Sequence, residues 1–322
     1  MSSSLVTLLG GCGPTADPSG TASNSTPAKR LQIVCTVGMV TDIVRQVAGE
    51  HADVTGLLKE GVDPHVYIPT GNDTGLALAA DLVFYSGLHL EGRMVENYEA
   101  ARKKGKSFFA VTDSIPHDQL RSSETISGVH DPHVWGDVKL WMECVREIAK
   151  RLKDHDPVHA ADYADNSDQL LSEMSKLDVY IREVIGTIPE QQRTLVTAHD
   201  AFAYFARAYG IKVRSVQGIS TESQAGVNDT NSLVAFLVEN QIPTVFVEAS
   251  VNPRDLQAVI EGAQQQQWSV RVGGTLYSDS MGPKGTYEGT YLGMQDHNAT
   301  LIARSLGGEA PERGWQGKLS FS

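Results

Sequence analysis

From Leu31 onward, short runs rich in apolar and β-branched residues alternate with longer runs whose apolar residues recur every three or four positions. This alternation is typical of an α/β fold with parallel sheets, because a connection between parallel strands normally runs through a helix. The pattern occurs twice. We therefore predict two α/β lobes, each a parallel sheet flanked by helices, with strands near residues 31–37, 54–58, 81–85, 107–111, 194–197, 213–217, 244–247 and 269–272.

A single long helix is predicted between the two lobes. Asp156 and Pro157 form a good helix start, and Gly186 and Pro189 mark the end. A helix from residue 157 to 185 would be roughly 43 Å long, which suits a stiff spine between lobes. The predicted division is therefore 1–30, a leader and tether; 31–155, the N-terminal lobe; 156–188, the linking helix; and 189–322, the C-terminal lobe.

The first thirty residues combine an apolar run, a cysteine and a polar stretch. The tetrapeptide Leu9-Gly10-Gly11-Cys12 resembles a bacterial lipobox, in which Cys12 is acylated after cleavage. Residues 13–29 are rich in Ser, Thr, Pro, Gly and Asn, a composition that favours a flexible tether. A secretory leader normally opens with Lys or Arg. Residues 1–4 contain neither, so we expect either a trimmed leader or a start upstream.

The charge balance narrows the class of partner. The chain has 27 basic and 39 acidic residues, a formal charge of -12. This argues against nucleic acid and against direct binding to an anionic membrane, since both need a basic face. No apolar run approaches the roughly 20 residues of a membrane-spanning helix. Cys35 and Cys144 lie in apolar runs, so we predict buried thiols rather than a disulfide.

Four histidine or aspartate positions stand at predicted strand ends or helix starts, where ligands of open α/β sheets bind. Three imidazoles and one carboxylate would suit zinc or manganese better than magnesium or calcium. Asp63 and Asp131, each two residues before one of these histidines, are candidates to orient a ligand ring or to approach the metal directly. The four positions are His65, His133, His199 and Asp279.

Taken together, these motifs resemble the metal-specific solute-binding proteins of ABC importers, the zinc- and manganese-uptake family. The resemblance runs from about Leu31 to Leu306. It rests on Asp63-Pro64-His65, Asp131-Pro132-His133-Val134-Trp135, His199-Asp200-Ala201-Phe202-Ala203-Tyr204-Phe205, Gln217-Gly218-Ile219-Ser220-Thr221-Glu222, Phe246-Val247-Glu248 and Asp279.

The resemblance implies that His65, His133, His199 and Asp279 hold one Zn²⁺ or Mn²⁺ as transported cargo in an interlobe cleft. It implies an ABC permease and its ATPase as partners, an extracytoplasmic, lipid-anchored location and little hinge closure. We further expect a monomer. Manganese-selective relatives often carry Glu at the third position, which is His199 here, and zinc-selective ones often carry a His-rich loop, whereas residues 114–129 contain only His117.

Two other classes of function share some of these features. A zinc-dependent hydrolase would need an open metal position and a general base, and no His-Glu-x-x-His motif occurs. A surface adhesin would share the acidic surface and the tether. We expect a binding protein rather than an enzyme.

Overall fold

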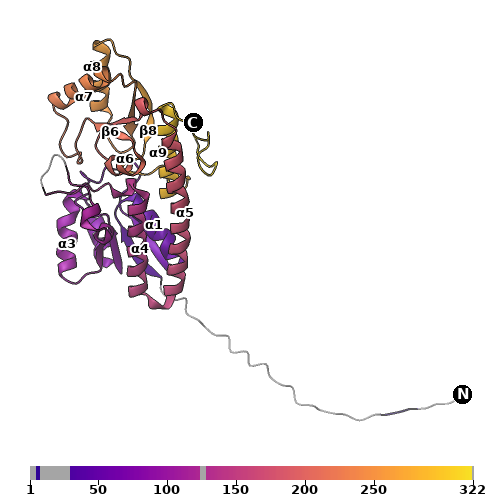
Figure 1. Ribbon diagram of the computed structural model, residues 1–322. Helices are drawn as coiled ribbons and strands as arrows, with labels where there is room; N and C mark the ends of the chain where they lie inside the picture. The colour runs from indigo at the N-terminus through magenta and orange to yellow at the C-terminus, as the bar shows by residue number, and fades with distance from the viewer. Residues whose placement is uncertain (1–4, 8–29, 124–127, 321–322) are drawn as a thin grey trace.

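The computed structural model describes residues 5–7, 30–123 and 128–320. Cys12 and the whole of the predicted tether, residues 13–29, lie outside the described residues. Two α/β lobes stand end to end, with one long helix beside both (Figure 1). The N-terminal lobe comprises β1 to α4 and the C-terminal lobe comprises β5 to α9.

The N-terminal lobe is built on a parallel sheet of four strands in the order β2-β1-β3-β4. Alternate side chains of a strand point to opposite faces. Ile33 and Cys35 pack into the core beneath the long helices, whereas Val34, Val83 and Tyr85 pack on the other face. The strands are β1 Leu31–Cys35, β2 Ala52–Gly56, β3 Leu82–Tyr85 and β4 Phe108–Ala110, and the helices are α1 Gly38–Ala48, α2 Gly71–Ala79, α3 Val95–Lys103 and α4 Val138–His155.

The C-terminal lobe divides its strands between two parallel pairs. β5 pairs with β6 and β7 with β8, and β5 lies against β7. The elements are β5 Thr194–Thr197, β6 Lys212–Ser215, β7 Thr244–Glu248, β8 Arg271–Leu276, α6 Ala203–Tyr209, α7 Val227–Glu239, α8 Arg254–Gln265 and α9 Tyr291–Ser305.

In this lobe, β8 and α9 differ from the sequence prediction for reasons that the packing explains. β8 begins later and continues through Gly273, where a side chain would collide with the Phe246 ring. The apolar spacing of residues 298–306 predicts a closing helix, but α9 begins seven residues earlier, at Tyr291, and is capped by the Thr290 hydroxyl. Its first turns bury Gln295 and Asp296, and these polar residues conceal the apolar periodicity.

The linking helix α5, Ala160–Gly186, is about 40 Å long and follows a 3-10 turn at Pro157–His159. Asp156 does not cap it; its carboxylate accepts a hydrogen bond from the Tyr163 hydroxyl. α5 packs on α1 and α4 in one lobe and on α6 and α9 in the other. A continuous helix with a buried stripe along both lobes makes a stiff connection.

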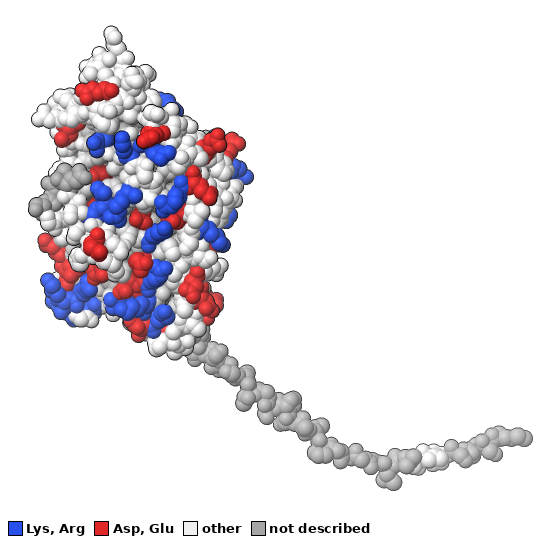
Figure 2. Space-filling model, viewed as in Figure 1, with Lys and Arg blue, Asp and Glu red and all other residues white. Residues whose placement is uncertain are grey.

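Acidic and basic side chains are interspersed on the visible face of the molecule (Figure 2). Among the described residues, no helix is both long enough and apolar enough to cross a membrane. The two internal cysteines, Cys35 and Cys144, are buried and unpaired, as predicted.

The packing of α5 predicts that shortening a buried side chain destabilises the protein more than shortening an exposed one. Leu177 is fully buried, whereas the Val179 side chain is 53% exposed. Leu177→Ala should lower the free energy of unfolding by about 2–5 kcal/mol. The control Val179→Ala should change it by less than about 0.5 kcal/mol. Urea denaturation measures both. Equal losses would mean that α5 does not support the core as described.

Candidate metal centre

The four predicted ligand residues come together between the lobes. His65 follows β2, His133 precedes α4, His199 follows β5 and Asp279 follows β8. One ligand atom from each lies within 4.8 Å of the others. The chain order therefore places two histidines from the N-terminal lobe opposite a histidine and a carboxylate from the C-terminal lobe.

The imidazole Nε2 atoms and the carboxylate oxygens face a common point. His199 Nε2 lies 3.0 Å from Asp279 Oδ2, His133 Nε2 lies 3.3 Å from Asp279 Oδ1, and His65 Nε2 lies 3.3 Å from His133 Nε2. All four residues are buried; His65 is 3% exposed and His133 and His199 are 0% exposed. Both carboxylate oxygens of Asp279 and Nε2 of His199 are buried without a hydrogen bond of good geometry among the described residues.

Buried polar atoms that lack partners are costly, and a cation would satisfy all of these at once. The donor set is three imidazole nitrogens and one carboxylate, which fits a borderline divalent transition metal. The arrangement can therefore bind such an ion in a closed, water-poor position.

The two Asp-Pro-His segments share one local turn. Asp63 Oδ1 accepts a hydrogen bond from the His65 backbone nitrogen at 2.9 Å, and Asp131 Oδ1 accepts one from the His133 nitrogen at 3.0 Å. Asp131 Oδ1 also lies 2.7 Å from His133 Nδ1, so it orients the ring. Asp63 instead uses Oδ2 to accept a hydrogen bond from the Thr221 hydroxyl.

Glu248 is a site residue that the sequence analysis names only within the Phe246-Val247-Glu248 motif, without a role at the centre. Its Oε1 accepts hydrogen bonds from the backbone nitrogens of Ala198 and His199, both at 2.9 Å. Its Oε2 lies 2.6 Å from His199 Nδ1. An acidic residue that ends a buried parallel strand, as Glu248 ends β7, was the available signal.

Electrostatics divide the three imidazoles into two kinds. Burial lowers the pKa of His65 to about 3. Burial also opposes a charge on His133, but the Asp279 carboxylate and the bond to Asp131 outweigh it and raise the pKa to about 9. For His199, Glu248 and Asp279 overcome burial and raise the pKa well above its ordinary value.

The pKa of Asp279 is shifted in the opposite direction. Burial alone would raise its pKa, but the charges of His199 and His133 hold the pKa of this carboxyl well below its usual range. These directions favour an ionised Asp279 between protonated His133 and His199 in the metal-free centre. An incoming cation would replace the protons on those imidazoles.

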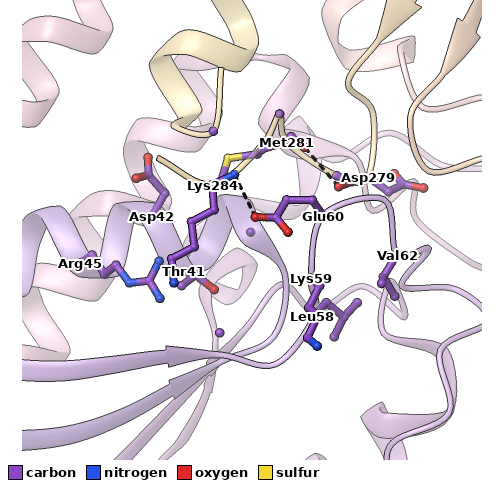
Figure 3. A pocket seen from close by; sticks show the side chains of 15 residues that line it. Thr41, Asp42, Arg45, Leu58, Lys59, Glu60, Val62, Asp279, Met281 and Lys284 are labelled. Atoms are coloured by element: carbon purple, nitrogen blue, oxygen red, sulfur yellow. Dashed lines mark hydrogen bonds between the residues drawn. The ribbon is translucent and has the colours of Figure 1, made fainter. Parts of the chain in front are cut away.

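Two cavities flank the centre. One, of about 400 Å³, adjoins Asp279, and its walls carry Lys59 and Glu60 from the N-terminal lobe and Met281 and Lys284 from the segment after β8 (Figure 3). The other, of about 480 Å³, lies over His65. Each cavity is walled by residues of both lobes.

The relatives found by sequence comparison are named for metal binding or metal uptake. The sequence model of the family described as zinc-uptake complex component A, periplasmic, matches residues 33–305. The manganese-binding lipoprotein MntA of Bacillus subtilis is 42% identical over 92% of this chain and 95% of its own length. The zinc-binding protein TroA of Treponema pallidum is 39% identical over 85% of this chain and 88% of its own length.

Solved structures agree with the sequence relatives. The periplasmic zinc-binding protein TroA from Treponema pallidum matches with a TM-score of 0.84 at 38% identity, covering 86% of this chain and 99% of that chain. The Fe(III)-bound YtgA from Chlamydia trachomatis matches with a TM-score of 0.78 at 28% identity, covering 88% of this chain and all of that one. The chain belongs to the zinc-uptake complex component A family of periplasmic metal-binding proteins.

Proposed function

We propose that this protein is the extracytoplasmic solute-binding component of an ABC importer for a divalent transition metal, zinc or manganese. The observation that carries the proposal is the set of buried, convergent donor atoms on His65, His133, His199 and Asp279. Relatives named as manganese- and zinc-binding proteins support it. Such a protein delivers its ion to a permease driven by an ATPase.

The donor set argues against hydrolysis. Four protein ligands complete a tetrahedral shell, whereas a catalytic zinc keeps one position for water. The same donors would bind zinc more tightly than manganese, following the usual order of divalent affinities. Capture of manganese at this site would therefore depend on which metal is available to the protein.

The first prediction of the proposed function concerns the number of ions bound per chain. Metal-free protein should bind one zinc ion per chain, and His133→Ala should weaken zinc binding by about a hundredfold or more, because the ion loses a ligand that Asp131 orients. His155→Ala, at an exposed histidine on α4, is the matched control and should bind as the parent does. Competition titration with a chelating dye measures both. Two tight sites per chain, or equal affinity in the two variants, would contradict the proposal.

The second prediction concerns protons. A bound imidazole must be neutral. Because the pKa values of His133 and His199 are raised and that of His65 is lowered, zinc binding at pH 7 should release about two protons. Affinity should therefore rise with pH toward about 9, by about two powers of ten per pH unit near neutrality.

Isothermal titration calorimetry in buffers of different ionisation enthalpy counts the released protons. Zinc binding to the Glu248→Gln variant should release fewer protons, because the Glu248 carboxylate contributes most to the raised pKa of His199. Zinc binding without proton release at pH 7 would contradict the charge state described for the centre.

Location follows a separate line of reasoning. We propose that Cys12 carries lipid and anchors a monomeric protein at the outer face of a bacterial membrane, with residues 13–29 as the tether and no other contact with the bilayer. Relatives named as lipoproteins support this. One acyl chain gives only marginal membrane binding, so stable anchoring needs more than one.

The third prediction tests the anchor. In cells that make the complete precursor, Cys12→Ser should move the protein from the membrane to the soluble fraction. Substituting Cys35→Ser, at a buried thiol, controls for loss of a cysteine as such. Fractionation and metabolic labelling with a fatty acid measure the outcome. An unlabelled, soluble parent protein would contradict the lipid anchor.

A further inference from the structure

The two ligands of the N-terminal lobe are held very differently. The His133 loop is fixed from several sides: the Trp135 indole donates to the Ser278 carbonyl at 3.0 Å, and the Tyr291 hydroxyl and Gln295 amide both donate to the Trp135 carbonyl. Trp135 is buried, so these contacts are shielded from water. The His133 side of the centre is thus tightly joined to the C-terminal lobe.

His65 depends on a short loop with three hydrogen bonds to the C-terminal lobe. The Gly61 nitrogen donates to Ser280 Oγ at 2.7 Å, and Glu60 Oε1 accepts from the Lys284 nitrogen at 2.9 Å. The third bond, from the Thr221 hydroxyl, reaches the Asp63 carboxylate that also holds the His65 backbone. Of these three contacts, the one made by Thr221 therefore lies nearest to His65 along the chain.

The solvent exposure of the four side chains also distinguishes the His65 side of the centre. His65 is the one member of the four-residue cluster with a measurably exposed side chain, at 3%, whereas the side chains of His133, His199 and Asp279 are at 0%. The cavity over His65 is lined on one wall by residues 88–96 and on the other by Ile219, Ser220 and Glu222. Thr221 is not itself a lining residue, but it lies between Ser220 and Glu222 in the sequence.

The two cavities differ in the net charge of their lining residues, and this charge affects how favourably each cavity holds a cation. The cavity over His65 is lined by the carboxylates Glu96 and Glu222 against the single guanidinium Arg93. The cavity beside Asp279 is lined by equal numbers of basic and acidic residues. They are Arg45, Lys59 and Lys284 against Asp42, Glu60 and Asp279. A divalent cation is favoured in the first cavity.

From these observations we propose that the ion enters and leaves past His65, and that Thr221 is a positioning residue whose hydrogen bond to Asp63 keeps this side of the centre closed. The inference rests on the proposed function and adds to it the route of the ion and the contact that controls its release. The Gln217–Glu222 segment, which includes Thr221, thereby acquires a role.

The backbone behind His65 leaves one direction for movement. A side chain at Gly92 would meet the His65 carbonyl oxygen, so the 86–92 loop packs directly against the ligand loop from within its own lobe. That loop is fixed by the buried Glu91 carboxylate, which accepts hydrogen bonds from the Thr36 hydroxyl and from the Ser86 and Gly87 nitrogens. Loss of the Thr221 bond would free His65 on the side toward the C-terminal lobe.

The closing experiment measures metal release in stopped flow, with zinc-loaded protein mixed with excess chelator. Thr221→Val removes the hydroxyl at nearly constant volume and should raise the release rate about tenfold, as expected for a hydrogen bond to a carboxylate. Thr221→Ser should restore the parental rate. Thr230→Val, at a hydroxyl on α7 that donates to the Gly226 carbonyl, is the matched control and should leave the rate unchanged.

A double-substitution cycle identifies the partner. In an Asp63→Asn background, Thr221→Val should add little further acceleration, because the two side chains act through one bond. The melting temperature of each metal-free variant separates a positioning role from general destabilisation. Full additivity, no acceleration by Thr221→Val, or no rescue by Thr221→Ser would overturn the role of Thr221.

The route is tested by association rates at low ionic strength. Glu222→Lys should slow zinc association several-fold, whereas Glu239→Lys, the same change at the exposed end of α7, should not. Equal rates in these two variants would overturn the route. A parent protein that binds no zinc would instead refute the proposed function, so the two failures are distinguishable.

Discussion

The structure depends on an ionised carboxylate buried between two lobes. Asp279 is almost wholly removed from water and can stay charged only because imidazoles from both lobes face it. A buried charge without a partner would be strongly unfavourable. In the metal-free protein, protons on His133 and His199 supply the compensating charge, and a divalent ion supplies it when bound. The charges of the centre therefore compensate one another across the cleft, with or without a bound ion.

The surrounding framework keeps these groups in place before any ion arrives. Parallel strands present His65, His199 and Asp279 at their carboxyl ends, and α5 packs on both lobes along one continuous face. Behind the histidines, Asp131 and Glu248 fix the ring nitrogens that do not face the centre. Such preorganisation favours tight binding, whereas an importer must also release its ion. We propose that the His65 loop, which the Thr221–Asp63 hydrogen bond joins to the C-terminal lobe, provides a local way to do so.

The sequence was informative where chemistry and pattern coincide. Strand and helix alternation predicted the α/β fold, and the repeated Asp-Pro-His segments led to two residues that the structure brings together with His199 and Asp279. The sequence was less informative about features that depend on tertiary packing. Glu248 lies far along the chain from His199, and the early turns of α9 bury polar residues that no periodicity reveals. The pairing of C-terminal strands in twos likewise depends on contacts between elements.

Asp63 and Asp131 show why a motif alone could not assign these roles. Both occupy the same turn and accept the same backbone hydrogen bond two residues on. Asp131 is buried beside the His133 ring, so its remaining capacity goes to the imidazole. Asp63 is only partly buried and faces Thr221 of the other lobe, so its remaining capacity goes to an interlobe contact. One tripeptide thus orients a ligand ring in one loop and joins the lobes in the other, because the neighbours of each carboxylate differ.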